Sequence, residues 1–152
     1  MTEAPAERIA NVLLIDDRRA DVELTRVYLQ VRDRLQFNLL VANGAKEALS
    51  VLQAAAHRGE SIDLLLVDIN MPGMDGFELL EALRRDPALK HISVVMCTGS
   101  TYDQDLARAR ALGAAGYMVK PASLAQLRPM LPDMPALRLL DDEVGIRLLR
   151  AA

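Results

Sequence analysis

The sequence predicts an α/β protein in which a doubly wound, five-stranded parallel sheet carries helices on both faces. Three observations lead to this prediction. Short apolar runs of strand length alternate with longer segments in which apolar residues recur every three or four positions. The short runs are apolar almost throughout, which is typical of strands buried on both faces. Repeated strand–helix–strand units of this kind require parallel strands joined by right-handed crossovers.

The N-terminal half contains two strand–helix pairs. Residues 9–15 (IANVLLI) form a run that is too short for a helix of ordinary length, so we expect a strand there. A helix should follow and bury one stripe, which consists of Leu24, Val27, Tyr28 and Val31. A second strand is expected over 37–41, followed by a helix whose apolar positions are Ala45, Ala48, Leu49 and Leu52.

The three remaining strands are expected over 62–67, 92–97 and 116–119. A segment rich in Pro and Gly follows the first of them and predicts a sharp turn. The next helical face consists of Phe77, Leu80 and Leu83, and a later helix over 102–112 should end at Gly113.

The two ends of the chain differ from this pattern. Residues 1–8 are polar and predict a loose lead-in, so the domain should cover 9–128. Prolines recur every third residue at Pro129, Pro132 and Pro135, and a helix begun at Ser123 should therefore end by Pro129. In the extension over 129–152, one apolar stripe predicts a short helix that either covers this domain or pairs with a second copy: Leu137, Leu140, Val144 and Leu148.

Length and composition exclude several classes of protein. The 152 residues suffice for one domain and leave no room for a second output domain. Hydrophobic residues make up 51% of the chain and charged residues 26%, as in soluble globular proteins. A net charge of −3 and 3% aromatic residues make nucleic acid an improbable direct partner. Without a membrane-spanning run, a leader or a second cysteine beside Cys97, a cytoplasmic location is expected.

Polar residues directly follow four of the expected strands. Asp16 and Asp17 follow the first, Asp68 the third, Thr98 the fourth and Lys120 the fifth. The carboxyl ends of parallel strands meet at one edge of a sheet, so these side chains should converge there. Acids after strands are also common helix N-caps, and it is the convergence of all five that indicates a site.

Three carboxylates at one edge require a cation. Carboxylate oxygens suit Mg²⁺, and no His or Cys cluster favours zinc, since His57 and His91 lie in expected loops and Cys97 inside a strand. Lys120 adds a positive point charge and Thr98 a hydroxyl donor. A carboxylate nucleophile, a metal ion, a lysine and a hydroxyl meet the demands of phosphoryl transfer, and the product would be an aspartyl phosphate.

The sequence resembles the receiver domains of two-component response regulators, the CheY-like proteins with a flavodoxin-like fold. The resemblance covers residues 9–128, and four segments carry it: LLIDD over 13–17, LLLVDINMPGMDG over 64–76, VVMCTGS over 94–100 and GYMVKP over 116–121. It implies that the protein is not an enzyme acting on a separate substrate but a phosphoacceptor that promotes only its own phosphorylation and dephosphorylation. The donor would be a sensor histidine kinase, and the signal would pass on by protein contact.

The resemblance also implies roles for individual residues. Asp68 would be the phosphoacceptor, Asp17 a direct Mg²⁺ ligand, Asp16 a ligand mainly through water, and Asn70 a ligand through its backbone carbonyl. Thr98 and Lys120 would contact the phosphoryl group. Tyr117 would be a switch whose rotamer follows Thr98, and the Lys120–Pro121 peptide would be cis.

A finer resemblance links the chain to short regulators paired with bacterial phytochromes, through ADVELT at 20–25. The chain departs from the family pattern at Arg18–Arg19, at Gly99 and in its proline-punctuated extension. Two other functions stay open. A receiver-like scaffold that is never phosphorylated would not need all five site residues. The other is an enzyme, a phosphatase or a nucleotide-binding flavodoxin-like protein; nucleotide binding would need a glycine-rich loop where Asp17–Arg18–Arg19 stands.

Overall fold

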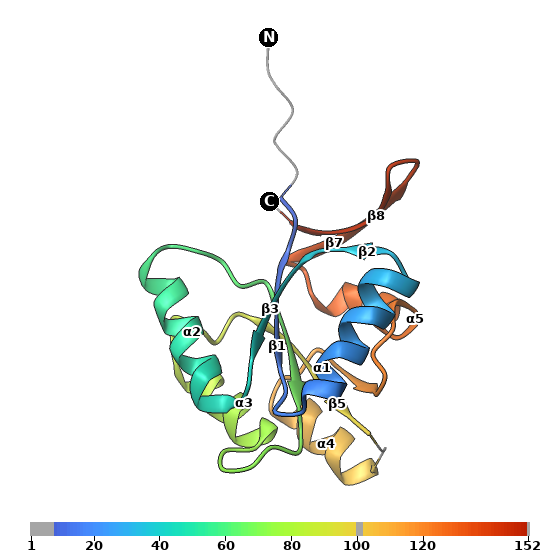
Figure 1. Cartoon of the computed structure of the whole chain (residues 1–152). Coiled ribbons are helices and arrows are strands. Elements are labelled where there is room, and N and C mark those ends of the chain that lie inside the picture. Colours follow the sequence, from blue (N-terminus) through green and yellow to red (C-terminus); the bar gives the residue numbers. More distant parts are fainter. Residues whose placement is uncertain (1–7, 100–101, 152) are drawn as a thin grey trace.

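The central sheet has five parallel strands in the order β3-β1-β4-β5-β6 (Figure 1). The computed structural model describes residues 8–99 and 102–151. All five residues of β4 are buried, as expected of an apolar strand at the centre of a parallel sheet. The predicted fold class is therefore confirmed, with these strands: β1 (Asn11–Ile15), β3 (Asn38–Ala42), β4 (Leu64–Asp68), β5 (Ser93–Thr98) and β6 (Gly116–Val119).

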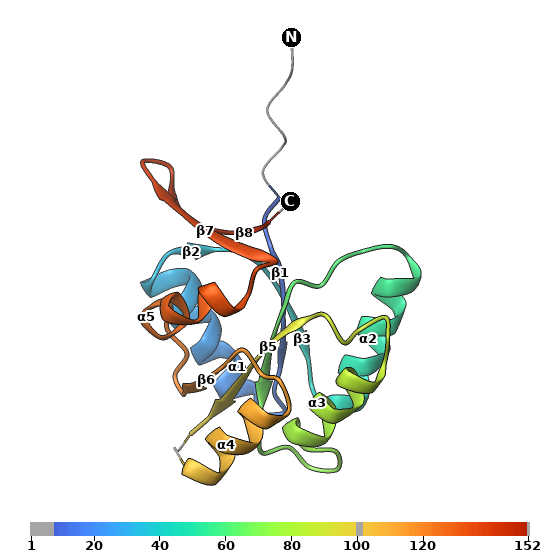
Figure 2. The ribbon, with the colours of Figure 1, turned by 180° about the vertical axis from the view of Figure 1, so that it is seen from behind.

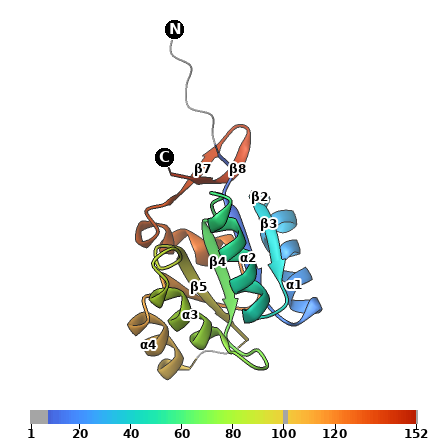
Figure 3. The ribbon, with the colours of Figure 1, turned by 90° about the vertical axis from the view of Figure 1, so that its left-hand side faces the viewer.

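Helices cover both faces of the sheet (Figures 1 and 3). On one face, an apolar layer joins the sheet to α2 (Ala45–His57), α3 (Gly76–Arg85) and α4 (Asp103–Ala111). On the other face, a second layer lies under α1 (Arg19–Arg26), the π-helix η1 (Val27–Arg32) and α5 (Leu124–Leu127). The sheet is thus the middle of three layers, and the loops lie at the ends of its strands.

The first helix does not bury the stripe that its spacing predicts. Leu24 is 47% exposed and Val31 57% exposed, whereas Thr25 and Leu29 are buried. Val22, Thr25 and Leu29 also have helical spacing, and this second face, which continues into the π-helical segment at Leu29, packs against the sheet. The prediction of a helix here is correct, but the predicted face is wrong.

The C-terminal extension is a β-hairpin, so the predicted amphipathic helix is wrong. Helix α5 ends at Leu127, before Pro129 as predicted, and a 3₁₀ turn, η2 (Arg128–Asp133), leads into β7 (Leu137–Asp142) and β8 (Gly145–Arg150). The two strands pair antiparallel, with Leu139 opposite Leu148. A two-residue turn at 143–144 joins them, and Gly145 has a φ of 140°, which L side chains rarely adopt.

This hairpin is part of the main fold. Strand β8 lies between β7 and the short β2 (Leu35–Gln36) in a second sheet of order β2-β8-β7. Residues just before β1 also bond to it: the Ala10 amide donates to the Leu148 carbonyl at 2.9 Å. Arg150 pairs with the buried Asp63 at 3.1 Å. The hairpin therefore lies at the amino ends of the central strands (Figure 2).

The remaining expectations concern the ends and the membrane. Of the expected lead-in over 1–8, only Arg8 falls within the described residues. Its carbonyl accepts a hydrogen bond from the Arg150 amide at 2.8 Å. No helix among the described residues is both long and apolar enough to span a bilayer.

Candidate functional site

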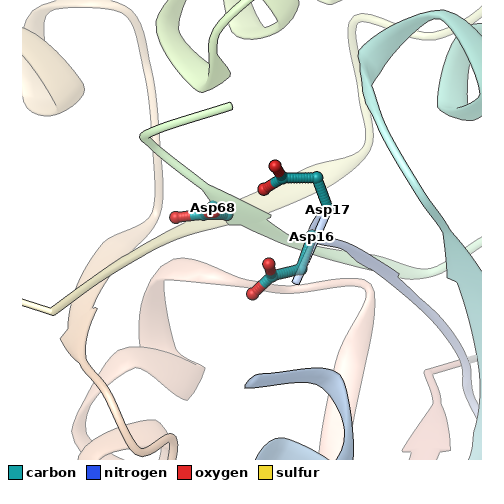
Figure 4. A group of neighbouring side chains, drawn as sticks. All are labelled: Asp16, Asp17 and Asp68. Carbon is teal, nitrogen blue, oxygen red and sulfur yellow. The ribbon is translucent and has the colours of Figure 1, made fainter. Parts of the chain in front are cut away.

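Three acids meet where the winding of the sheet changes direction. The chain leaves β1 towards β3 on one side, and β4 lies on the other side of β1. Asp16 and Asp17 follow β1, and Asp68 ends β4. One carboxylate oxygen from each lies within 4.8 Å of the others, as Figure 4 shows. The predicted convergence of these acids is thus present, at the position where open α/β sheets bind ligands.

The three acids differ in their surroundings. Asp16 and Asp68 are buried, whereas Asp17 is exposed. Asp16 Oδ1 accepts a hydrogen bond from the Arg18 amide at 2.9 Å, and Asp68 Oδ1 accepts one from the Asn70 amide at 3.3 Å. These bonds fix both buried carboxylates and place the Asn70 backbone at the edge of the site.

Lys120 lies among the acids. It follows β6, precedes a cis peptide bond to Pro121 and reaches three carboxylates. Its Nζ lies 2.9 Å from Asp16 Oδ2, 3.0 Å from Asp21 Oδ2 and 3.3 Å from Asp68 Oδ1. Burial lowers the pKa of Lys120, but the bonds to Asp16 and Asp21 and the charge of Asp68 outweigh it and raise that pKa. The ammonium is therefore charged at neutral pH.

Asp21 is the site residue that was not predicted. It lies in the first turn of α1, not at a strand end, so the alignment of strand ends gives no indication of it. Its position four residues after Asp17, on the helix that begins at this edge, is the signal that could have identified it.

Burial raises the pKa of the Asp68 carboxyl, and the neighbouring Asp16 carboxylate adds to this effect, while Lys120 opposes it. The folded state therefore binds the Asp68 proton more tightly than the unfolded state does. Ionised Asp68 costs stability at neutral pH, and this cost disappears as the pH falls through the raised pKa. The carboxylate is destabilised in the resting protein, as expected of a reactive group.

We predict that Asp68→Asn stabilises the protein by about 1 kcal/mol at pH 7 in EDTA, because it removes a buried charge next to Asp16. The gain should shrink on acidification, because wild-type Asp68 takes up its proton as the pH falls through its raised pKa. Urea unfolding followed by circular dichroism, at pH 7 and at lower pH, measures the gain. A gain that grows on acidification, or a less stable variant at pH 7, would contradict the assignment of the pKa shift.

Thr98 and Tyr117 lie on neighbouring strands at the same end of the sheet. Thr98 ends β5 and is buried, and Tyr117 lies on the neighbouring β6. The side chain of Tyr117 is hydrogen-bonded to Thr98 and to the backbone of Tyr102, the residue just before α4. Burial raises the pKa of the Tyr117 phenol, which therefore stays protonated. These bonds connect the end of β5 to the start of α4.

The loop after Asp68 is held close to the site by the start of α3. Asp75 caps this helix in a capping box with Glu78, whose amide donates to Asp75 Oδ1 at 2.9 Å. A Cβ on Gly76 would lie 2.5 Å from the Asp68 carbonyl oxygen, so only glycine allows this approach. The cap and the glycine together fix the direction of the chain beyond Asp68.

Comparison with known protein families matches residues 12–132 to the response regulator receiver domain. The chain belongs to this family. It is 33% identical over 129 residues to the chemotaxis protein CheY-3 of Vibrio cholerae, a match that covers 85% of this chain and 94% of CheY-3. The suspected family is confirmed.

Two solved structures resemble this receiver domain. The bacteriophytochrome response regulator AtBRR superposes with a TM-score of 0.76 at 31% identity, covering 90% of this chain and 99% of AtBRR. The Mn²⁺-bound form of the response regulator Rcp1 superposes with a TM-score of 0.63 at 28% identity, covering 80% of this chain and 88% of Rcp1. The suspected likeness to phytochrome-associated regulators is therefore also present in structure.

The donor atoms of the receiver site suit a hard divalent cation. Asp16, Asp17 and Asp68 offer only carboxylate oxygens as ligands. Asp17 is the exposed member of the three, so its carboxylate is open to a cation from solvent. Burial raises the pKa of the nearby Cys97 thiol to about 12, so this residue offers no thiolate to a softer metal.

Proposed function

We propose that the protein is a response regulator of a two-component phosphorelay that accepts a phosphoryl group on Asp68 from a sensor histidine kinase. The observation that carries this proposal is the meeting of Asp16, Asp17 and Asp68 within 4.8 Å, with Lys120 3.3 Å from Asp68. Membership of the receiver family supports it. A scaffold that is never phosphorylated remains the alternative, and the experiment below separates the two.

The transfer follows from the position of the carboxylate. Asp68 Oδ1 accepts the hydrogen bond of the Asn70 amide and lies 3.3 Å from Lys120 Nζ, which holds the carboxylate at the end of β4. An oxygen of this carboxylate attacks phosphorus. The new O–P bond forms as the P–N bond of the phosphohistidine breaks, and the imidazole leaves with the electron pair and takes up a proton. The Lys120 ammonium neutralises charge on the phosphoryl oxygens.

Mg²⁺ would be held by Asp17 and Asp68, by the Asn70 backbone carbonyl and by Asp16 mainly through water. When bound, it neutralises the carboxylates and the transferred phosphoryl group. Support comes from the oxygen-only donor set and from the Mn²⁺-bound form of the relative Rcp1.

The phosphorylated state would act through Thr98 and Tyr117. Thr98 would donate its hydroxyl to the new phosphoryl oxygens, which changes its bond to Tyr117 and through it the link to Tyr102 at the start of α4. Phosphorylation would thereby shift an existing equilibrium between two arrangements of this face. A partner protein in the cytoplasm would recognise the shifted face, and the protein would catalyse no reaction beyond its own phosphorylation and dephosphorylation.

Intact mass spectrometry tests the function. Wild type, incubated with acetyl phosphate and Mg²⁺, should gain the mass of one phosphoryl group, and EDTA should prevent this gain. Asp68→Asn should gain nothing, whereas Asp141→Asn, which changes an exposed acid of the hairpin, should behave as wild type. Wild type without added mass would refute the phosphoacceptor function and leave the scaffold.

We propose that the sensor histidine kinase that phosphorylates Asp68 is a bacteriophytochrome. The support is the structural likeness to the bacteriophytochrome response regulators AtBRR and RtBRR, with TM-scores of 0.76 and 0.74. A purified bacteriophytochrome kinase should then phosphorylate Asp68 faster than an unrelated sensor kinase does, and equal rates would count against the pairing.

We also propose that two copies associate through the C-terminal extension. Strand β7 is an edge strand of its sheet, and Val144 at the hairpin tip is 72% exposed. Light scattering should give twice 16.7 kDa for wild type and a lower mass for Val144→Lys. Val31→Lys, at another exposed valine, is the matched control. A wild-type mass of one chain, or equal effects of both substitutions, would rule this interface out.

A further inference from the structure

The ammonium of Lys120 has one partner that does not come from a strand end. Its Nζ donates hydrogen bonds to Asp16 and Asp21 at 2.9 and 3.0 Å and forms an ion pair with Asp68 at 3.3 Å. The Asp68 contact is the longest of the three, although Asp68 is the residue that would carry the phosphoryl group. Asp21 therefore holds part of the ammonium's bonding capacity in the resting protein.

The contact of Asp21 is not a by-product of helix capping. Asp21 lies in the first turn of α1, whose N-cap Arg18 makes no side-chain cap bond. The hydrogen bond to Asp21 comes instead from Lys120, 99 residues away in sequence. The carboxylate is thus used to bind a side chain of the site.

Lys120 has a buried side and an open side. Asp16 and Asp68 are almost fully buried, whereas the Asp21 side chain is 26% exposed. A cavity of about 140 Å³ lies beside Asp21 and Lys120 and is also lined by Leu24, Thr25 and Pro121. The ammonium therefore contacts Asp68 on the buried side and Asp21 on the open side at the same time.

We propose that Asp21 is a positioning residue that competes with the phosphoryl group on Asp68 for the Lys120 ammonium and so lowers the phosphorylated fraction. This inference rests on the proposed function. A phosphoryl group adds negative charge beside Asp68, and the Asp21 carboxylate both repels it and neutralises the lysine that would stabilise it. A unit charge at this range in a partly exposed site changes such an equilibrium about threefold to tenfold.

Asp21 should have the opposite effect on the divalent cation. Its charge adds to the attraction that Asp16, Asp17 and Asp68 exert on Mg²⁺, so its removal should weaken Mg²⁺ binding. Asp21→Asn, which keeps the shape of the side chain, should therefore raise phosphorylation at saturating Mg²⁺ and lower Mg²⁺ affinity. A purely structural defect would reduce both.

The first experiment measures Lys120 without phosphorylation. The chain has only three lysines, Lys46, Lys90 and Lys120, so acylation of each amine can be followed by mass spectrometry in one sample. In metal-free protein, Asp21→Asn should raise labelling of Lys120 at least about threefold, since the amine loses a charged partner. Lys46 and Lys90 should not change. Equal labelling of Lys120 in wild type and variant would overturn this inference and leave the proposed function standing.

The second experiment measures the competition. With acetyl phosphate and saturating Mg²⁺, the ratio of phosphorylated to unphosphorylated Asp21→Asn should exceed that of wild type about threefold to tenfold. Calorimetry should show weaker Mg²⁺ binding. Glu23→Gln, an acid on the same helix that pairs with Arg26, should match wild type, and Asp21→Glu should restore the wild-type ratio.

The outcomes separate the two proposals. A wild type that takes up no phosphoryl group overturns the proposed function and this inference together. A phosphorylated wild type with an unchanged or lower ratio in Asp21→Asn overturns only the role of Asp21.

Discussion

Deletion of the hairpin, residues 136–152, is expected to abolish cooperative folding of the receiver. Leu137, Leu148 and Leu149 are each at most 5% exposed, and the first two pack with Leu14 of β1 and Leu29 of η1 in one apolar layer. Loss of three buried leucines costs on the order of 6 kcal/mol or more. This is comparable with the whole stability of a small domain, about 5–15 kcal/mol. Loss of the unfolding transition in urea, followed by circular dichroism, measures it.

Point variants make this prediction quantitative even if the deleted chain does not fold. Leu149→Ala should lower the free energy of unfolding by about 3 kcal/mol, because it opens a cavity at a fully buried position. Val144→Ala at the exposed tip should change it by less than about 0.5 kcal/mol. A deleted chain that unfolds cooperatively near the wild-type midpoint would show that the hairpin is only an appendage. Because the hairpin belongs to the core, association is better tested at its tip than by deletion.

The sequence was sufficient to predict the central sheet because its strands are buried on both faces. A run such as LLLV at 64–67 has no polar face, and repeated strand–helix units then leave few topologies. The same reasoning brought Asp16, Asp17, Asp68 and Lys120 to one edge. Convergence follows from chain direction alone and needs no knowledge of side-chain conformations.

Elements outside this pattern were not predictable in the same way. The spacing of Leu137, Leu140, Val144 and Leu148 fits a helix, yet these positions also occur in two paired strands with a turn at 143–144. What decides between them is long-range: β8 completes bonds to residues 8–10 and to β2, which no local pattern encodes.

Asp21 illustrates the limit for the site. A carboxylate in the first turn of a helix is usual because of the helix dipole, so its residue type alone does not mark it as a site residue; only its position on the helix that begins at this edge does. Its contact with Lys120 depends on the conformation of the long lysine side chain, which reaches from the end of β6 to α1. In the same way, helical spacing fits two faces of the first helix, and packing against the sheet, which buries Thr25 and Leu29 and leaves Leu24 exposed, decides between them.

Replacement of Lys120 by Met is expected to lower the free energy of unfolding by about 3 kcal/mol at pH 7 in EDTA. The substitution leaves Asp16 and Asp68 buried side by side without their cation. The raised pKa of Lys120 means that its stabilising contribution is fully present at pH 7 and is lost only as the pH rises above its ordinary value of 10.5. Urea midpoints of wild type and Lys120→Met at pH 7 measure the difference.

Mg²⁺ should restore most of this loss, because the ion would supply the positive charge that the variant lacks and no ammonium would compete with it for the carboxylates. The gain in unfolding free energy on adding Mg²⁺ should therefore be larger for Lys120→Met than for wild type. Lys46→Met, at an exposed lysine, should match wild type both in EDTA and in Mg²⁺. If Mg²⁺ stabilised the variant and wild type equally, the ion and the ammonium would not share these carboxylates, and the charge balance inferred for the site would be wrong.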